Sequence, residues 1–203
     1  MRQRHLILII ALIAVVVSAA AQNINPYVAG LPLNHVRRWD AMAPVTSGAV
    51  LITRPLQDVK MATQYFDGLG RPLQTVARQG SLETGGTATD MVSPVMYDEF
   101  GREQYKYLPF MANNTGGNPS LTDGAFKMNP FQQQNTFMSA QYGAQGETFF
   151  YGKTVFEPSP LNRPDKTMAP GNSWVGGPSC GRGVEMKYWV NTVTDNVKKW
   201  NVN

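Results

Sequence analysis

The sequence has few of the residues from which active sites are usually built. Its 203 residues include one cysteine, Cys180, and two histidines, of which only His35 lies beyond the first 21 residues. A single thiol cannot form an intramolecular disulfide, and no second cysteine or close histidine completes a metal site around it. A Ser/His/Asp or Cys/His centre would require His35 to meet a nucleophile across the fold. We therefore expect no enzyme, no cofactor and no metal site.

Charged residues are also scarce, and their distribution argues against a nucleic-acid partner. The whole chain carries a net charge of +4. Setting aside Arg2 and Arg4 leaves 16 basic against 14 acidic residues. Only residues 37–38 and 198–199 remain as basic pairs, which is too little clustered positive charge to attract nucleic acid.

A long hydrophobic run occurs only at the N-terminus. Arg2 and Arg4 precede an apolar run over residues 6–17, and three alanines follow at 19–21. This pattern predicts a signal peptide over residues 1–21 and an exported protein, secreted or at the cell surface. The run is shorter than the ~20 residues that a membrane-spanning helix needs. We expect no stable membrane span after cleavage; an uncleaved anchor helix is the alternative.

The remaining composition favours short strands and turns. The chain has 19 glycines and 14 prolines and little helical periodicity. Such a profile is typical of β-structure with many turns. We predict a mainly β fold, an array of antiparallel β-hairpins with long loops and at most one short helix.

A turn motif recurs along this array. Its acid, left-handed residue and arginine are Asp67, Gly70 and Arg71 in the first copy, Asp98, Gly101 and Arg102 in the second, and Glu157, Asn162 and Arg163 in a third copy with two extra turn residues. Glycine, and asparagine among other residues, tolerates the positive φ that closes a tight turn. The acid can accept hydrogen bonds from nearby backbone N–H groups. We expect each arginine to pair with the acid of its own or a neighbouring turn or with exposed carbonyls; the alternative is that the arginines face an anionic glycan or a packaged partner. An apolar residue inside each turn, Leu69, Phe100 or Leu161, suggests that a neighbour covers the tip.

These residues resemble the Tyr-Asp-x-x-Gly-Arg core of the YD repeats of bacterial RHS proteins. Residues 64–76, 97–110, 159–163 and 169–174 are similar to the N-terminal domain, of unknown function, of exported RHS-repeat proteins. Phe66 stands where the repeat usually has Tyr, and the third copy lacks the glycine. The resemblance implies hairpins that form an open sheet and begin a large β shell. It also implies further YD repeats, of the same or a longer chain, as partners.

The chain divides into five expected segments: a signal peptide (1–21), lead-in strands (22–62), two paired hairpins (63–110), an Asn/Gln/Gly-rich loop (111–148), and a third hairpin with a C-terminal strand (149–203). Within them we predict strands at 35–39, 49–53 and 184–190, and a flexible surface loop at 78–93. Asn129 and Pro130 favour a short helix over residues 131–142, as cap and first helical residue. After Thr192, a helical turn and a second hairpin arm are both open.

Two functions are compatible with these sequence features. The first is a non-catalytic structural module, the N-terminal or capping part of an RHS/YD-repeat shell. The second is a cell-surface carbohydrate-binding module, in which Trp174, Trp189 and Trp200 would stack on sugars. Because aromatic side chains dominate small β cores, we expect most of the aromatic residues to serve packing.

Overall fold

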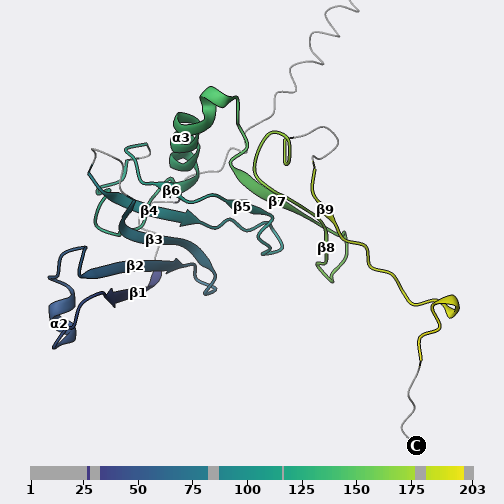
Figure 1. Ribbon diagram of the computed structural model, residues 1–203, viewed down its shortest axis with the longest axis horizontal. Coiled ribbons are helices and arrows are strands. Elements are labelled where there is room, and N and C mark those ends of the chain that lie inside the picture. Colours follow the sequence, from purple (N-terminus) through teal and green to yellow (C-terminus); the bar gives the residue numbers. More distant parts are fainter. Residues whose placement is uncertain (1–26, 28–32, 82–86, 116, 177–181, 199–203) are drawn as a thin grey trace, which may run out of the picture.

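The computed structural model describes residues 27, 33–81, 87–115, 117–176 and 182–198. The described chain is mainly β and forms two antiparallel sheets (Figure 1). The predicted signal peptide, Cys180 and Trp200 lie outside the described residues. Among the helices that are described, none is long and apolar enough to cross a membrane.

The first sheet has the strand order β1-β2-β3-β4-β6. Its strands are β1 (Asn34–Ala41), β2 (Val59–Phe66), β3 (Pro72–Ser81), β4 (Thr89–Pro94) and β6 (Phe110–Met111). Alternate residues of β2 are buried, as a strand with one covered face requires. Pro72 is the first residue of β3, where its missing N–H does least harm to the ladder.

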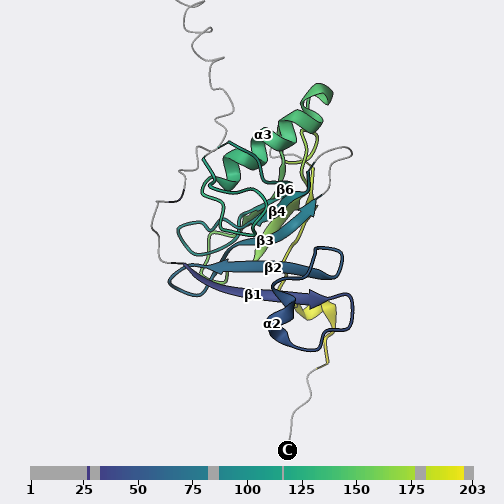
Figure 2. The ribbon, with the colours of Figure 1, turned by 90° about the vertical axis from the view of Figure 1, so that its left-hand side faces the viewer.

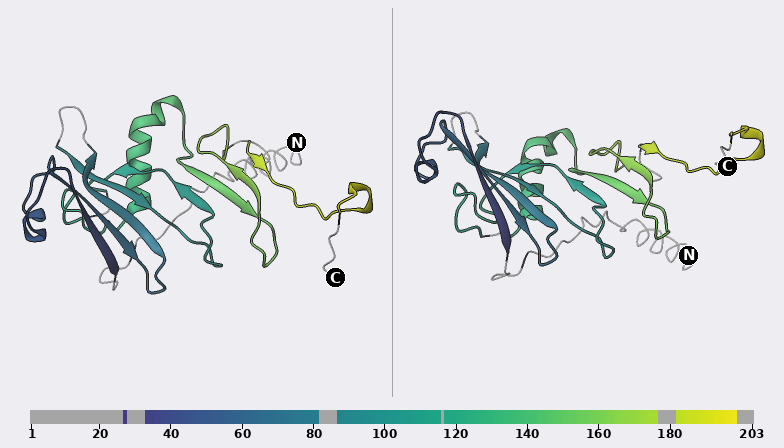
Figure 3. Two further views of the ribbon diagram at one scale, coloured as in Figure 1. Left: turned by 60° about the horizontal axis from the view of Figure 1, so that its bottom comes forward. Right: turned by 90° about the horizontal axis from the view of Figure 1, so that it is seen from below.

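The second sheet has the order β5-β7-β8-β9. It contains β5 (Tyr105–Tyr107), β7 (Tyr151–Phe156), β8 (Pro164–Met168) and the two-residue β9 (Val184–Glu185). The second copy of the turn motif lies between the sheets. The strands on either side of this turn, β4 and β5, belong to different sheets. An isolated β-bridge between Met96 and Tyr105 links the chain before the turn to the chain after it. The three turns lie in a row along one side of the molecule (Figures 1 and 3).

The helix α3 (Pro130–Tyr142) packs against β6 and β4 (Figures 1 and 2). It matches the prediction of a helix that starts with Asn129 and Pro130, although the Asn129 side chain makes no capping hydrogen bond. The main core joins the two sheets to this helix. It consists of Tyr65, Val76, Val92, Phe110, Ala112, Met138 and Phe150.

Three local predictions differ from the structure. Residues 49–53 were expected as a strand, but α2 (Gly48–Leu51) is a helical turn. The expected loop 78–93 is short, because β3 continues to Ser81 and β4 starts at Thr89. Residues 111–148, expected as a loop with a short helix, contain α3 beside loop segments, and several of their side chains are buried. The expected strand 184–190 pairs only as β9, and the helical alternative after Thr192 is present as the 3₁₀ turn η2 (Val193–Asp195).

Candidate functional site

The first two turns have the same hydrogen bonds. In the first, Asp67 Oδ1 accepts from the backbone N–H groups of Leu69 and Arg71, each at 2.9 Å, and Oδ2 accepts from Arg71 Nε at 2.8 Å. In the second, Asp98 accepts from Phe100 N, Arg102 N and Arg102 Nε at 3.0, 2.9 and 2.8 Å. Gly70 and Gly101 both have a φ of +77°. The acid therefore closes the turn and holds the arginine at once.

The third turn reaches a similar arrangement with different residues. Glu157 binds Arg163 through both carboxylate oxygens, at 2.9 and 2.8 Å. This turn is two residues longer, and the Ser159 hydroxyl donates a hydrogen bond to Glu157. The Ser159 hydroxyl also accepts from Leu161 N, whereas in the other two turns the aspartate accepts from the corresponding backbone N–H. Asn162 has a φ of +53° in the place of the glycine.

These contacts stabilise the charged acids. Hydrogen bonds from Arg71 hold the pKa of Asp67 below its usual value. At Asp98, burial raises the pKa, but the hydrogen bonds from Arg102 outweigh it and the pKa is lowered. The side-chain hydrogen bonds from Arg163 and Ser159 lower the pKa of Glu157 to about 2. All three acids are therefore ionised at neutral pH, and each arginine pairs with the acid of its own turn.

Each arginine also lies over an aromatic residue further along the chain, which for Arg71 and Arg102 is the residue directly before the next turn. The guanidinium carbon is 4.7 Å from the ring centroid of Tyr97 for Arg71, 4.7 Å from Phe156 for Arg102, and 4.4 Å from Tyr188 for Arg163. These are distances of a cation–π contact. We call the three turns with these aromatic residues the turn ladder.

The ladder extends to the left-handed residues of the turns. Arg102 Nη1 donates to Asn162 Oδ1 at 3.1 Å. A Cβ atom added to Gly101 would lie 3.0 Å from Arg71 Nη1. The arginine of one turn therefore packs against the left-handed residue of the next, and successive turns are coupled from the N-terminal to the C-terminal side.

The apolar tips of the turns are not covered by the described chain. Leu69, Phe100 and Leu161 are 79%, 70% and 67% exposed. The expectation that a neighbour covers them is thus not met within the described residues.

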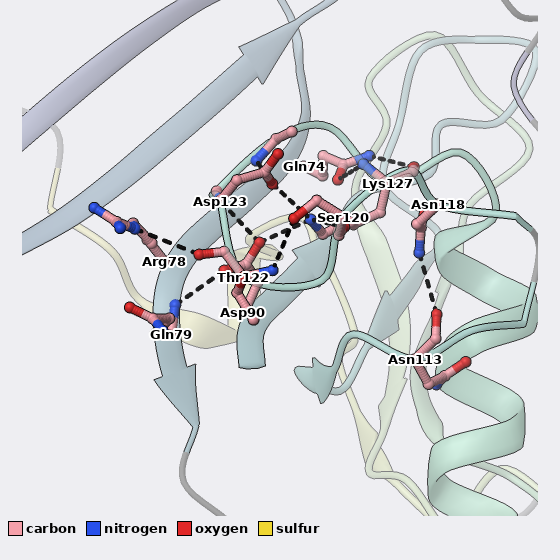
Figure 4. A network of polar contacts seen from close by, with 12 residues as sticks. Gln74, Arg78, Gln79, Asp90, Asn113, Asn118, Ser120, Thr122, Asp123 and Lys127 are labelled. Atoms are coloured by element: carbon pink, nitrogen blue, oxygen red, sulfur yellow. Dashed lines mark hydrogen bonds and ion pairs between the residues drawn. The ribbon is translucent and has the colours of Figure 1, made fainter. Parts of the chain in front are cut away.

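A buried polar cluster fastens the segment before α3 to the first sheet. Lys127 and Asp90 are fully buried, and Lys127 Nζ lies 2.7 Å from Asp90 Oδ2 (Figure 4). Asp90 also accepts from Gln79 N at 2.9 Å and Gly124 N at 2.8 Å. The side chain of Gln74 exchanges two 3.0 Å hydrogen bonds with the backbone of Lys127. Sequence reasoning missed this cluster, because residues 37 or 53 positions apart leave no spacing signal.

A hollow of about 310 Å³ lies beside the third turn. Its lining includes Arg163, Asp165, Lys187, Tyr188 and Trp189. Trp189 is 83% exposed, whereas Trp174 is 43% exposed and lies in the turn after β8, outside this lining. The structure thus places one of the predicted glycan-stacking tryptophans beside a predicted arginine, and does not bring the other to the same hollow.

His35 lies on the exposed edge strand β1 and its ring contacts Tyr65 at a centroid distance of 5.7 Å. No group of three or more described His, Cys, Asp or Glu residues is arranged to hold a metal ion.

The match to a family model covers residues 37–190, which includes all three turns and both sheets apart from the first three residues of β1. The chain belongs to the DUF6443 family. This family is described as a domain of unknown function. No curated protein and no solved structure matches this DUF6443 chain. The geometry of the turn ladder is therefore the principal guide to its function.

Proposed function

We propose that the chain is a non-catalytic structural module of an exported RHS/YD-repeat protein, in which stacked hairpins form the beginning or cap of a larger β assembly. The observation that carries the proposal is the turn ladder, in which each turn arginine binds the acid of its own turn and stacks on the aromatic residue of the following position in the ladder. Single hairpins are marginally stable and need neighbours. Repeats that contact mainly their neighbours are suited to extended scaffolds.

The N-terminal end of the first sheet supports a capping role. At the N-terminal end, β1 pairs along the whole of β2, including Asn34 with Phe66, the aromatic position of the first turn. Among the described residues, no arginine stacks on Phe66, whereas all later aromatic positions carry one. A strand without the turn motif thus occupies the side from which a preceding repeat would approach.

The test is to remove one link of the ladder. Arg102→Ala loses the ion pair to Asp98, the stack on Phe156 and the hydrogen bond to Asn162. We expect a loss of about 1–2 kcal/mol, which lowers Tm by about 5 °C for a chain of this size. In the matched control, Arg38→Ala breaks a pair with Asp40 whose arginine is 73% exposed, and Tm should stay within about 1 °C. If both variants melt with the wild type, the arginines do not hold the module together.

A carbohydrate-binding module is the second candidate, favoured by the hollow beside the third turn. Trp189 presents an exposed ring there, next to Arg163 and Lys187. Stacking on a sugar should quench or shift tryptophan fluorescence, and Trp189→Ala should abolish the response to neutral and uronic-acid oligosaccharides. A variant that keeps the full response would remove this candidate.

A further inference from the structure

We infer that residues 184–190 form an edge strand that receives an antiparallel strand from a β-hairpin of the same turn type. This inference rests on the proposed function. It adds the edge of the chain at which the β assembly grows and the kind of hairpin that this edge binds. The occupant is a hairpin with an acid, a left-handed glycine or asparagine and an arginine in its turn.

The spacing of the turn ladder identifies residues 184–190 as the segment that would lead into a fourth turn, which we call the fourth position. Phe66 and Tyr97 are 31 residues apart, and Phe156 and Tyr188 are 32 apart. Arg163 lies over Tyr188 at 4.4 Å, as the earlier arginines lie over Tyr97 and Phe156. The residue after Tyr188 is Trp189, however, where the other copies have an acid.

The fourth position is therefore incomplete within residues 182–198. Its incoming segment pairs with β8 through Thr167 and Val184 and through Lys166 and Glu185. Beyond β9, Met186 N donates to Asp165 O at 2.9 Å and the Tyr188 hydroxyl donates to Pro164 O at 3.3 Å. The described residues contain no outgoing strand on its other edge. The chain leaves the second sheet at this point (Figure 1).

Apolar exposure marks the same segment as unfinished. Val184, Trp189 and Val190 are 69%, 83% and 89% exposed. Exposed apolar side chains along an unpaired strand edge favour pairing with another strand. Because this edge continues the established strand order β5-β7-β8-β9, an added strand would extend an existing sheet.

The opposite end of the molecule is less suited to growth. The outer strand of the first sheet at that end, β1, carries three charges within residues 37–40, whereas residues 184–190 carry Glu185 and Lys187. Charges along an edge strand oppose pairing with a second chain. The coupling of the turns also has a direction, since each arginine lies over an aromatic ring further along the chain. Both observations favour growth at the edge formed by residues 184–190.

The experiment uses the full chain and a synthetic peptide with the sequence of its own residues 97–110, which contains the second turn and the strand after it. Amide hydrogen exchange is measured with and without the peptide. At a peptide concentration ten times its Kd, exchange of residues 184–190 should slow by about tenfold. A control peptide with Asp98→Ala and Arg102→Ala, which loses the ion pair of the turn, should give little protection.

Two chain variants complete the test. Tyr188→Ala removes the aromatic ring at the fourth position and should abolish the protection, whereas Val193→Ser, at a residue 98% exposed outside the segment, should retain it. Protection on β1, equal protection by both peptides, or no protection at 184–190 would overturn the inference. If Arg102→Ala still lowers Tm, the proposed scaffold stands and only this growth edge is wrong.

Discussion

Removing either partner of the buried ion pair between Lys127 and Asp90 should destabilise the whole fold. Both side chains have no exposed surface. Asp90→Ala would leave the Lys127 ammonium without its closest carboxylate, and would leave the N–H groups of Gln79 and Gly124 without their acceptors. Breaking a buried pair from one side costs about 3–5 kcal/mol. For a chain of this length, a loss of about 4 kcal/mol lowers Tm by about 8–16 °C.

A double-mutant cycle separates the ion pair from the rest of the cluster. Lys127→Met should cost about 3 kcal/mol or more, because it leaves Asp90 charged and buried. The double variant Asp90→Ala, Lys127→Met removes both charges and should cost less than the sum of the two single changes. It should not return to wild-type stability, since the two backbone N–H groups stay unpaired at about 1–3 kcal/mol.

Urea and thermal unfolding, followed by circular dichroism and tryptophan fluorescence, provide the measurement. Coincident transitions in both signals would show that a two-state free energy is meaningful. Asp40→Ala serves as the control, because its pair with Arg38 is exposed and should contribute less than about 1 kcal/mol. Additive single changes, or an Asp90→Ala variant within about 1 kcal/mol of the wild type, would refute the argument that this pair fastens residues 113–128 to the sheet.

Three further outcomes are expected. Gly70→Ala should lower the free energy of unfolding by about 1–2 kcal/mol through backbone strain alone, because nothing lies within 4 Å of the new Cβ. Gly101→Ala should cost more, because its Cβ also meets Arg71 Nη1. Equal losses in urea unfolding would contradict this coupling of the turns. Because the folded pKa of Glu157 is lowered from 4.5 to about 2, its stabilising effect should be present above pH 4.5 and lost as the pH falls toward 2. Glu157→Gln should remove that part of the dependence of Tm on pH, and an unchanged acid profile would argue against the pair with Arg163. Gln74→Leu should cost about 2 kcal/mol, since it leaves the buried N–H and C=O of Lys127 unpaired, and wild-type urea stability would contradict it.

The turns could be predicted because their chemistry is local. An acid, a residue that tolerates positive φ, and an arginine lie within four to six positions, and the hydrogen bonds among them do not depend on distant parts of the chain. The helix α3 was predictable for a similar reason, since Asn129 and Pro130 mark its start. Residues 49–53 were misassigned because a short apolar run does not distinguish a strand from a helical turn.

The sequence by itself determined the three turns and the mainly β class, because these depend on neighbours a few residues apart, and it left several partners open for each arginine. Only the tertiary structure decided that β5 pairs with β7 in the second sheet, that Lys127 is buried against Asp90, and that the three turn arginines stack on Tyr97, Phe156 and Tyr188. Those contacts join residues some 25 to 60 positions apart in the chain. Their formation depends on which surfaces exclude water together, and no local pattern of residues records that choice.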